Sequence, residues 1–446
     1  MGVRDFAFPL HTPETASAGG GMGSDFGIAS ALGSSFSRWI TSHRDLPLRL
    51  NQYTLSFSRE SSNAPFLRSC QYLVQEAYSA HLTQRYACEE RDQVLDIYSA
   101  LYRELLAVPV VKGYRGASSN GNRDIVTPAT TETPTDETKI SILLGYLPTL
   151  NQWIEAGTFR ELGRTISREH DITVWAPPFL PAEETDDNPV HIWQNTWTLT
   201  TRSIGLIILT YADNRGLVLP PRVAPTQVLL IPQGARLTEE DRQILHDEIN
   251  VIHATLVQRG VRAVADLRDD RSPAWKWNEG LVRGVPVLLG LRIEDVRDRV
   301  LTVYRRDIEK GKSGWKVCIE IKDLMIVIPR LLGEVQDELL RRAEERFSLD
   351  NRLVETWDNF IREFCGEYAD RNGFGGCLVL HCLGEGCGKE IESLVAGARQ
   401  EALDPLTPSV KYICIPWEQP KDTDGKACIN PNCTKVAKKW AMFGCK

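Results

Sequence analysis

The sequence has no apolar run long enough to cross a bilayer and no export signal at its start. A membrane-spanning helix needs roughly 18 or more consecutive apolar residues, and no such stretch occurs. The first residues, MGVRDFAFPLH, do not show the basic-then-apolar pattern of a signal peptide. We therefore expect a cytoplasmic protein that does not enter a membrane.

An even number of cysteines and an excess of positive charge are missing as well. The cysteine count is 11, which argues against a framework made purely of disulfides. In a reducing cytoplasm, clustered cysteines indicate a metal site before a disulfide. The formal net charge of −7 excludes an overall basic nucleic-acid clamp but leaves room for a local basic face.

The remaining composition is that of an ordinary globular protein, with 42% hydrophobic and 25% charged residues. A length of 446 residues predicts about two to four domains. The Gly/Ser/Ala-rich stretch 10–37 and the Ser/Thr/Pro/Gly-rich stretch 114–138 are typical of loops or linkers. Between them, the spacing of apolar residues predicts helix from Leu73 to Leu106.

After Pro220-Pro221 the sequence alternates between short strands and helices. TQVLLIPQ, VRAVADLR and VPVLLGLR are typical of strands, and VLTVYRRD with WKVCIEIK predicts a hairpin. Thr238 is expected to cap a helix that ends at Gly260. This series predicts an α/β domain over residues 224–325, followed by a long amphipathic helical region at 330–365.

Two pairs of cysteines near the C-terminus share one spacing. Cys382 and Cys387 lie in HCLGEGC, and Cys428 and Cys433 lie in ACINPNC. Each pair has four residues between its cysteines, and Gly or Pro allows the loop to turn tightly. Four thiolates supplied by two such loops suit a tetrahedral structural Zn²⁺ site. Buried cysteines without a metal are the alternative.

A single cation precedes an apolar segment in NTWTLTTRSIGLIIL. Arg202 follows Thr198, Thr200 and Thr201, so a planar cation lies next to several hydroxyl groups. Such a group suits a polyphosphate and its metal ion. An ion pair at the edge of a buried element explains the same residues equally well.

The stretch NTWTLTTRSIGLIILTYADNRGLVLPPRVAPTQVLLIP resembles the third signature motif of prolyl-tRNA synthetases of the eukaryotic and archaeal type. Further similarity follows in the same order along the chain, in RWITSHRDLPLRLNQ, PFLRSCQYLVQEAYSAH and LLAVPVVKGYRG. VRAVADLRDDRSPAWKWNEGLVRGVPVLL is similar to the anticodon-binding domain, and SVKYICIPWEQP and KKWAMFG are similar to the zinc-bearing C-terminal domain.

The resemblance implies a class II synthetase fold in three domains. Residues 1–218 would form an α+β catalytic domain on an antiparallel sheet, residues 224–325 an α/β anticodon-binding domain, and residues 330–446 a small α+β zinc-bearing domain. The implied activity joins proline, or a proline-like amino acid, to tRNA through an acyl-adenylate, with ATP, Mg²⁺ and structural Zn²⁺ as cofactors. The resemblance also implies a possible homodimer. Most of the first motif's helix, which makes the dimer interface in the family, is missing from this sequence.

The resemblance also implies roles for particular residues. Arg202, Arg68 and Glu60 would be catalytic. Glu60, Arg68, Glu155, Thr158, Thr200 and Arg202 would bind ATP. Glu76, Tyr146, Arg160 and Thr198 would line the amino-acid pocket. Asp269, Lys276 and Arg283 would contact tRNA, with a solvated face as the alternative for Lys276 and Arg283. Cys382, Cys387, Cys428 and Cys433 would bind zinc.

Several positions depart from the family. The loop that grips the proline nitrogen falls on Gly27 and Ala29, and the second motif's arginine falls on Ser58. Such changes predict an altered amino-acid pocket with a partly retained nucleotide site. Three hypotheses therefore stay open: a divergent ligase, an inactive paralogue that binds tRNA or regulates, and a copy whose N-terminal part is missing from this sequence.

Overall fold

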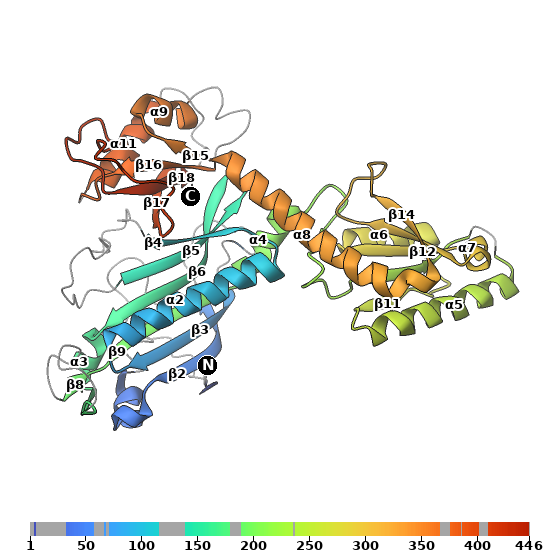
Figure 1. Cartoon of the computed structure of the whole chain (residues 1–446), viewed down its shortest axis with the longest axis horizontal. Helices are drawn as coiled ribbons and strands as arrows, with labels where there is room; N and C mark the ends of the chain where they lie inside the picture. Colours follow the sequence, from blue (N-terminus) through green and yellow to red (C-terminus); the bar gives the residue numbers. More distant parts are fainter. Residues whose placement is uncertain are drawn as a thin grey trace. The chain divides into compact units, whose positions relative to one another are not determined.

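The computed structural model describes residues 4–5, 33–57, 67, 71–115, 139–178, 189–234, 237–365, 375–384, 386–400 and 409–445 (Figure 1). The chain divides into two compact units. Unit 1 comprises Met1–Ala100, Val110–Leu206 and Phe347–Lys446, and unit 2 comprises Leu101–Pro109 and Ile207–Arg346. The three domain ranges proposed from the sequence stay predictions.

The described strands of unit 1 form an eleven-stranded sheet in the order β1-β2-β3-β9-β6-β5-β4-β17-β18-β16-β15. Neighbours are antiparallel except for β1 with β2 and β15 with β16, so the expected antiparallel sheet is confirmed. The strands are β1 Arg4–Asp5, β2 Leu48–Phe57, β3 Gln71–His81, β4 Val110–Arg115, β5 Lys139–Leu147, β6 Gln152–Gly163, β9 Trp193–Thr200, β15 Asn351–Val354, β16 Gly376–His381, β17 Val410–Pro416 and β18 Lys439–Cys445. A small separate ladder pairs β7 Thr173–Val174 with β8 Val190–His191.

The sheet continues from the middle of the chain into its C-terminal part. The junction lies between β4 and β17, where Arg115 pairs with Cys414 and Gly113 with Pro416. Beyond β17, a core of buried apolar side chains joins β16 and β18 to the helices α9 Trp357–Cys365 and α11 Cys387–Gln400. The C-terminal strands are therefore part of the same sheet as β2 to β9.

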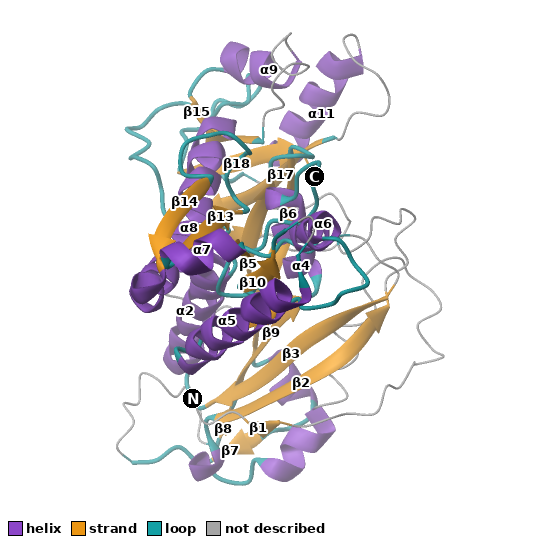
Figure 2. Cartoon of the chain, turned by 90° about the vertical axis from the view of Figure 1, so that its right-hand side faces the viewer, coloured by secondary structure: helices purple, strands orange, loops and turns teal. Residues whose placement is uncertain are grey.

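The helix α2, Gln84–Ala100, packs against one face of this sheet. Figure 2 shows β2, β3 and β9 as adjacent strands. The predicted helix from Leu73 to Leu106 is wrong in its first part, because residues 71–81 form β3. Almost every residue from Val74 to His81 is buried on both faces, polar residues included, so apolar and polar residues do not alternate with the period of two that predicts a strand. Unit 1 also contains η1 His43–Asp45, a helical turn over residues 33–39, α3 Thr165–Glu169 and the start of α4 Arg202–Tyr211.

Unit 2 has the predicted α/β character. Its described strands are ordered β11-β10-β12-β13-β14, with the first three parallel and the last two antiparallel. They are β10 Val228–Pro232, β11 Ala263–Ala265, β12 Val287–Leu291, β13 Val300–Arg305 and β14 Lys316–Glu320. The helices are η2 Leu101–Leu105, α5 Glu239–Gln258, α6 Pro273–Val282, α7 Ile293–Asp298, η4 Ile321–Asp323 and α8 Leu324–Asp350.

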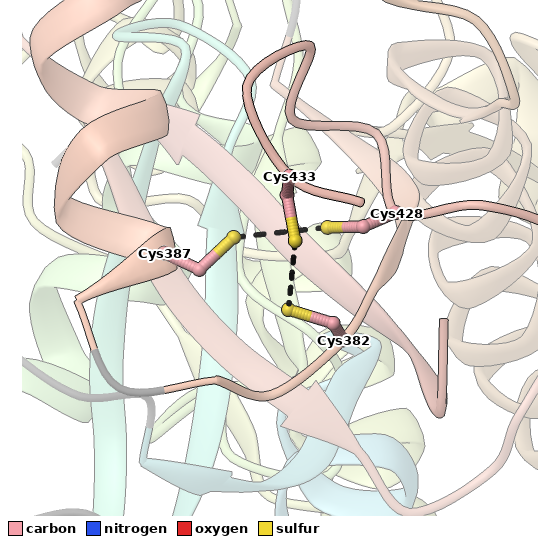
Figure 3. Close-up of side chains that lie close together, drawn as sticks. All are labelled: Cys382, Cys387, Cys428 and Cys433. Carbon is pink, nitrogen blue, oxygen red and sulfur yellow. Dashed lines mark hydrogen bonds between the residues drawn. The ribbon is translucent and has the colours of Figure 1, made fainter. Parts of the chain in front are cut away.

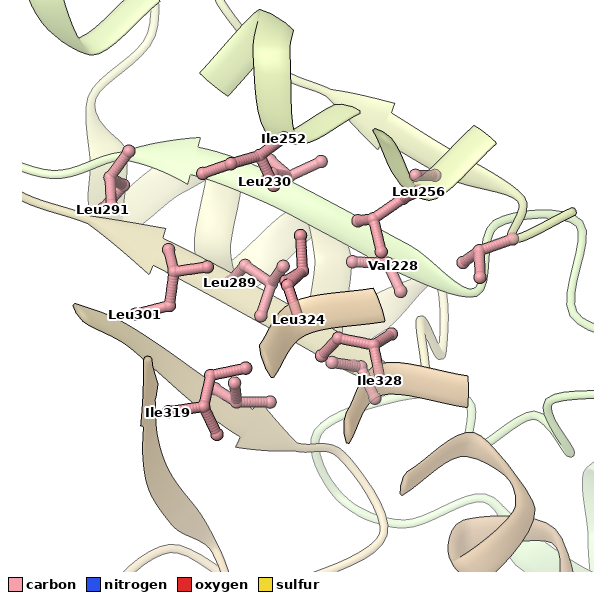
Figure 4. Packing of buried hydrophobic residues seen from close by; sticks show 14 of the residues in the cluster. Val228, Leu230, Ile252, Leu256, Leu289, Leu291, Leu301, Ile319, Leu324 and Ile328 are labelled. Atoms are coloured by element: carbon pink, nitrogen blue, oxygen red, sulfur yellow. The ribbon is translucent and has the colours of Figure 1, made fainter. Parts of the chain in front are cut away.

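Helices cover both faces of the unit 2 sheet, which explains why β10 and β12 are buried along their whole length. On one face, Val228 and Leu230 pack with residues of α5 and the first turns of α8, as Figure 4 shows. On the other face, Leu229 and Leu288 pack with α6. The predicted cap of α5 is confirmed, because the side chain of Thr238 accepts a hydrogen bond from the backbone N–H of Asp241.

The long helix near residue 330 differs from its prediction. α8 begins at Leu324, includes Pro329 and ends at Asp350, and the strand β15 separates it from α9. The amphipathic pattern of residues 330–365 therefore belongs to two helices with a strand between them. Among the described residues, no helix is both long and apolar enough to span a bilayer.

Candidate active site and metal centre

One face of the unit 1 sheet gathers most of the described residues predicted to bind ATP or the amino acid. Side chains alternate between the two faces of a strand, and directly paired residues share a face. Glu76 of β3 pairs with Thr198 of β9, which pairs with Thr158 of β6. These three side chains form a row across neighbouring strands, on the face opposite α2. We call this the front face and the α2 side the rear face.

A second row lies two residues along the same strands. Tyr78 of β3 pairs with Thr196, which pairs with Arg160 of β6. Thr196 is 4% exposed, and its hydroxyl has no hydrogen-bond partner in the described part of the chain. The front face therefore carries a buried carboxylate and a half-buried guanidinium on either side of threonine hydroxyl groups.

Arg202 begins α4, directly after the strand that carries these threonines. Its backbone N–H donates to the hydroxyl of Thr200 at 3.3 Å, and its Nε donates to the carbonyl of Leu67 at 3.0 Å. The structure thus brings Arg202 and Thr200 together at the edge of the front face. Glu60 and Arg68, and the departures at Gly27, Ala29 and Ser58, lie outside the described residues.

Glu155 of β6 faces the same side but is engaged by a neighbouring cation. Its carboxylate accepts a hydrogen bond from the guanidinium of Arg115 at 2.7 Å, and both side chains are mostly buried. The pair joins β6 to the end of β4 across the intervening strand β5. Glu155 therefore contributes a neutralised pair to the front face rather than an isolated negative charge.

Tyr146 lies near the end of β5, at a distance from the other residues predicted to line the amino-acid pocket, and its role there stays a prediction. It is 4% exposed and packs against Trp153 and Phe347 at centroid distances of 5.4 and 6.5 Å. Its hydroxyl donates to Asn151 at 3.0 Å. Along β5 it lies four residues from Ile142, the partner of Thr158, a span of about 13 Å. Its aromatic ring fills a core at the end of the strand.

The four paired cysteines come together as predicted. Their sulfur atoms all lie within 4.8 Å of one another, with Cys387 and Cys428 at 3.7 Å and Cys382 and Cys433 at 3.6 Å (Figure 3). Zn–S bonds of 2.3 Å in a tetrahedron require sulfur atoms about 3.8 Å apart. The contact with Cys387 lowers the pKa of Cys428 to about 5, and the contact with Cys428 raises that of Cys387. The geometry fits a four-thiolate zinc site.

Comparison with known proteins agrees with these features. The family model described as "Prolyl-tRNA synthetase, C-terminal" matches residues 362–446. A relative from Arabidopsis thaliana, "Proline--tRNA ligase, cytoplasmic", is 30% identical over 410 residues, which cover 92% of this chain and 69% of the relative. The chain belongs to the prolyl-tRNA synthetase family.

The similarity extends to solved structures of this family. The crystal structure of prolyl-tRNA synthetase from Cryptosporidium parvum, complexed with L-proline and AMP, has 32% sequence identity and a TM-score of 0.75. The similarity covers 93% of this chain and 78% of that one. A relative from Saccharomyces cerevisiae is 32% identical over 415 residues, and the chain spans only 56% of its length. The class II synthetase fold inferred from the sequence is thus confirmed.

In unit 2 of this prolyl-tRNA synthetase family member, the three predicted tRNA-binding residues differ in exposure. The side chain of Arg283 is 71% exposed and pairs with Glu279, and that of Asp269 is 66% exposed, 3.9 Å from Arg242. Lys276 is only 3% exposed, so the alternative of a solvated face is wrong for this residue.

Lys276 is held below the surface by its neighbour. Its ammonium donates to the backbone carbonyl of Asp266 at 3.0 Å and lies 3.8 Å from that residue's carboxylate. Burial lowers the pKa of Lys276, and the nearby carboxylate opposes the shift. Lys276 therefore supports the loop after β11 from within and does not present a cation to a phosphate.

An exposed tryptophan in this region was not predicted from the sequence. Trp275 is 40% exposed, and the guanidinium groups of Arg268 and Arg271 lie 5.2 and 4.8 Å from its ring centre. Arginine over an aromatic face is a geometry that also accepts a nucleobase. The signal in the sequence was the tryptophan at the third position of a helix that Ser272 caps, close to two arginines.

A buried carboxylate on the rear face was also overlooked. Glu90 of α2 accepts hydrogen bonds from Arg49 at 2.7 Å, His81 at 2.7 Å and Asn195 at 3.2 Å, and from the hydroxyl of Ser79. Burial opposes its ionisation, but the bonds from His81, Ser79 and Arg49 together lower the pKa of Glu90 to about 2. Nothing in the helical sequence around Glu90 distinguishes it from the solvated Glu89 beside it.

Proposed function

We propose that this chain activates an amino acid with ATP as an acyl-adenylate and transfers the acyl group to tRNA, with proline as the first candidate. The family supports this reading, because relatives across the same region are named as proline–tRNA ligases. One observation supports the proposal for particular residues. Glu76, Thr158, Thr196, Thr198 and Arg160 share the front face, and Arg202 begins the helix at its edge.

The charges on the front face suit the two ends of an amino acid. The strands of Glu76 and Arg160 are separated only by β9, and the two residues are offset by two positions along the strands, so their backbones are about 12 Å apart. Both side chains extend from the same face and narrow this gap. The ammonium or imino group of the substrate would lie toward Glu76, and its carboxylate toward Arg160. The hydroxyls of Thr196 and Thr198 would contact the atoms between them.

Activation then requires the carboxylate to meet the α-phosphate of ATP. A carboxylate oxygen forms a bond to the α-phosphorus, the bond from that phosphorus to the bridging oxygen breaks, and pyrophosphate leaves with the electron pair. Negative charge grows on the phosphate oxygens during this step, and a fixed guanidinium stabilises it. Arg202 is proposed for this role, with Thr200 and Thr158 beside it. Mg²⁺, bound with ATP, supplies further charge neutralisation.

Two further parts belong to the proposal. Zn²⁺ held by Cys382, Cys387, Cys428 and Cys433 would be structural, since four thiolates leave no position for water. tRNA would contact the exposed side of unit 2 that carries Arg283, Asp269 and the stacked Trp275. A cytoplasmic location fits four reduced thiols kept for a metal, and it matches the printed name of the Arabidopsis relative.

ATP–pyrophosphate exchange over a panel of amino acids tests the proposal. The panel contains proline, azetidine-2-carboxylate, pipecolate and prolinamide, which lacks the carboxylate. We expect exchange with proline, none with prolinamide, and a fall of about 100-fold or more when Arg202→Gln removes the charge. Arg85→Gln is the matched control, because Arg85 is an exposed arginine on α2 that pairs with Glu89 of the same helix.

Three results would separate the hypotheses. Exchange with proline followed by charging of tRNA supports the complete reaction. Exchange without charging restricts the activity to amino-acid activation. Absence of exchange with every compound in the panel, in zinc-loaded protein that is folded and binds tRNA, would overturn the ligase proposal.

A further inference from the structure

On the rear face of the sheet, one buried carboxylate bonds to the same strands that carry the front-face residues. The side chain of Glu90 is 2% exposed, and the donors that reach it come from three strands. Arg49 belongs to β2, Ser79 and His81 to β3, and Asn195 to β9. One side chain of α2 thus connects the three neighbouring strands that carry Gln52, Glu76 and Thr198 on their other face.

Both oxygens of this carboxylate accept hydrogen bonds. One oxygen accepts from the guanidinium of Arg49, and the other is approached by Ser79, His81 and Asn195. Each carboxylate oxygen has about two lone-pair positions, so the three donors crowd the second oxygen and leave it no free position. The imidazole of His81 and the amide of Asn195 are themselves buried, at 2% and 1% exposure. Without an acceptor at Glu90, the amide of Asn195 would keep only its bond to the carbonyl of Ala87, and the imidazole of His81 only its contact with Ser79, so each buried group would lose a partner at a free-energy cost.

The residues that bond to Glu90 lie next to front-face residues in the sequence. Ser79 directly follows Tyr78, and Asn195 directly precedes Thr196. Consecutive residues of a strand point to opposite faces, so a shift of the backbone that moves Ser79 or Asn195 also moves its neighbour on the front. Arg202 is further removed, because it belongs to α4 and its contacts are to Thr200, five residues along β9 from Asn195, and to the carbonyl of Leu67.

We propose that Glu90 is a positioning residue for the amino-acid side of the site. Its charge holds β3 and β9 at the spacing that places Glu76 and Thr196 for the substrate, while the ATP side depends on it much less. The inference rests on the proposed function for its kinetic consequence, but not for its structural one. The positioning role predicts a change in the KM for the amino acid without an equal change in the KM for ATP. A general loss of stability would not affect the two KM values differently.

Glu90→Gln in the full chain is the decisive variant, because it keeps the size of the side chain and removes its charge. In pyrophosphate exchange we expect the KM for proline to rise by about tenfold, equivalent to about 1.4 kcal/mol, with the KM for ATP changed by less than about twofold. Glu90→Asp retains the charge and should recover most of the affinity for proline, to within about threefold of the unchanged protein.

Glu392→Gln is the matched control within unit 1. Glu392 is also a buried carboxylate, 9% exposed, and accepts hydrogen bonds from the backbone N–H of Tyr412 at 2.8 Å and the ammonium of Lys411 at 3.1 Å. It links α11 to β17 and not to β3 or β9. We expect a comparable fall in melting temperature with both KM values unchanged.

Hydrogen exchange supplies a readout that does not need catalysis. Deuterium uptake in peptides covering residues 71–81 and 193–200 should rise in Glu90→Gln and stay unchanged in Glu392→Gln, under conditions where both variants are folded. If deuterium uptake rises in Glu90→Gln while the protein without substitutions activates no amino acid, the proposed function fails. The structural role of Glu90 in holding β3 and β9 then still stands. Equal effects of the two variants on these peptides, or equal changes in the KM values for proline and ATP, would overturn the positioning role.

Discussion

The buried arginine of unit 2 yields an asymmetric prediction about stability. The side chain of Arg306 is 0% exposed, and its guanidinium binds both carboxylate oxygens of Asp213, at 2.8 and 2.6 Å. It also donates to the backbone carbonyls of Leu281 at 3.1 Å and Gly216 at 3.2 Å. The side chain of Asp213 is 39% exposed. The two partners therefore differ in access to water once the pair is broken.

This difference determines the expected cost of each substitution. Asp213→Ala leaves a fully buried guanidinium without its counterion, which costs about 3–5 kcal/mol. Arg306→Met removes the buried charge, lets Asp213 turn toward water and leaves two carbonyl groups with one donor fewer, at a cost of about 1–3 kcal/mol. We therefore expect Asp213→Ala to destabilise unit 2 more than Arg306→Met does.

The measurement is the free energy of unfolding of unit 2 in the full chain. Hydrogen exchange in peptides from β12 and β13, followed over a series of urea concentrations, reports this unit separately from unit 1. The double variant should be close to Arg306→Met alone, because Asp213 has no buried cation left to satisfy. A loss for Arg306→Met equal to or larger than that for Asp213→Ala would refute the reasoning, since it would show that desolvation of the arginine is not the dominant cost.

Three more predictions concern the metal, the acid limb of stability and a turn. Purified protein should contain one zinc per chain by elemental analysis, and Cys433→Ser should lose it and melt at a lower temperature, whereas Cys318→Ser, at an exposed cysteine outside the cluster, should not. The pKa of Glu90 is lowered from 4.5 to about 2 in the folded protein, so its charge stabilises the fold above pH 4.5. This stabilisation is lost as the pH falls from 4.5 toward about 2. The difference in unfolding free energy between the unchanged protein and Glu90→Gln should therefore shrink between about pH 5 and about pH 3, and a difference independent of pH would contradict the assignment. Gly216 has φ of +123° and a Cβ there would lie 2.5 Å from the Cα of Val282, so Gly216→Ala should cost more than about 2 kcal/mol in urea unfolding, clearly more than Gly260→Ala, where only the positive φ opposes a side chain.

The features predicted correctly from the sequence are those whose physical signal is local. The cluster of four cysteines was predicted because two short loops with equal spacing carry paired thiols. The cap at Thr238 and the alternating strands of unit 2 were found because capping and strand patterns span only a few residues. Arg202 and Thr200 are neighbours in sequence, so their proximity at the start of α4 followed almost directly.

The features that were missed depend on pairing between distant segments. The strand β3 was read as helix because burial on both faces removed its alternation. The packing of Tyr146 against Trp153 and Phe347 could not be predicted, because these residues come from other parts of the chain. Lys276 looks like a surface cation until the loop of Asp266 folds over it. Glu90 becomes a hub only when Arg49, His81 and Asn195 reach it from three strands.

The pairing of β4 with β17 has a consequence for truncated forms of this protein. A chain cut before Val410 would leave the backbone N–H and C=O groups of residues 113–115 without the partners that β17 provides. Unpaired strand edges recruit strands from other molecules, so such a fragment should self-associate instead of behaving as a smaller enzyme. The strand β17 therefore covers an edge of β4 that would otherwise be open to pairing with another chain.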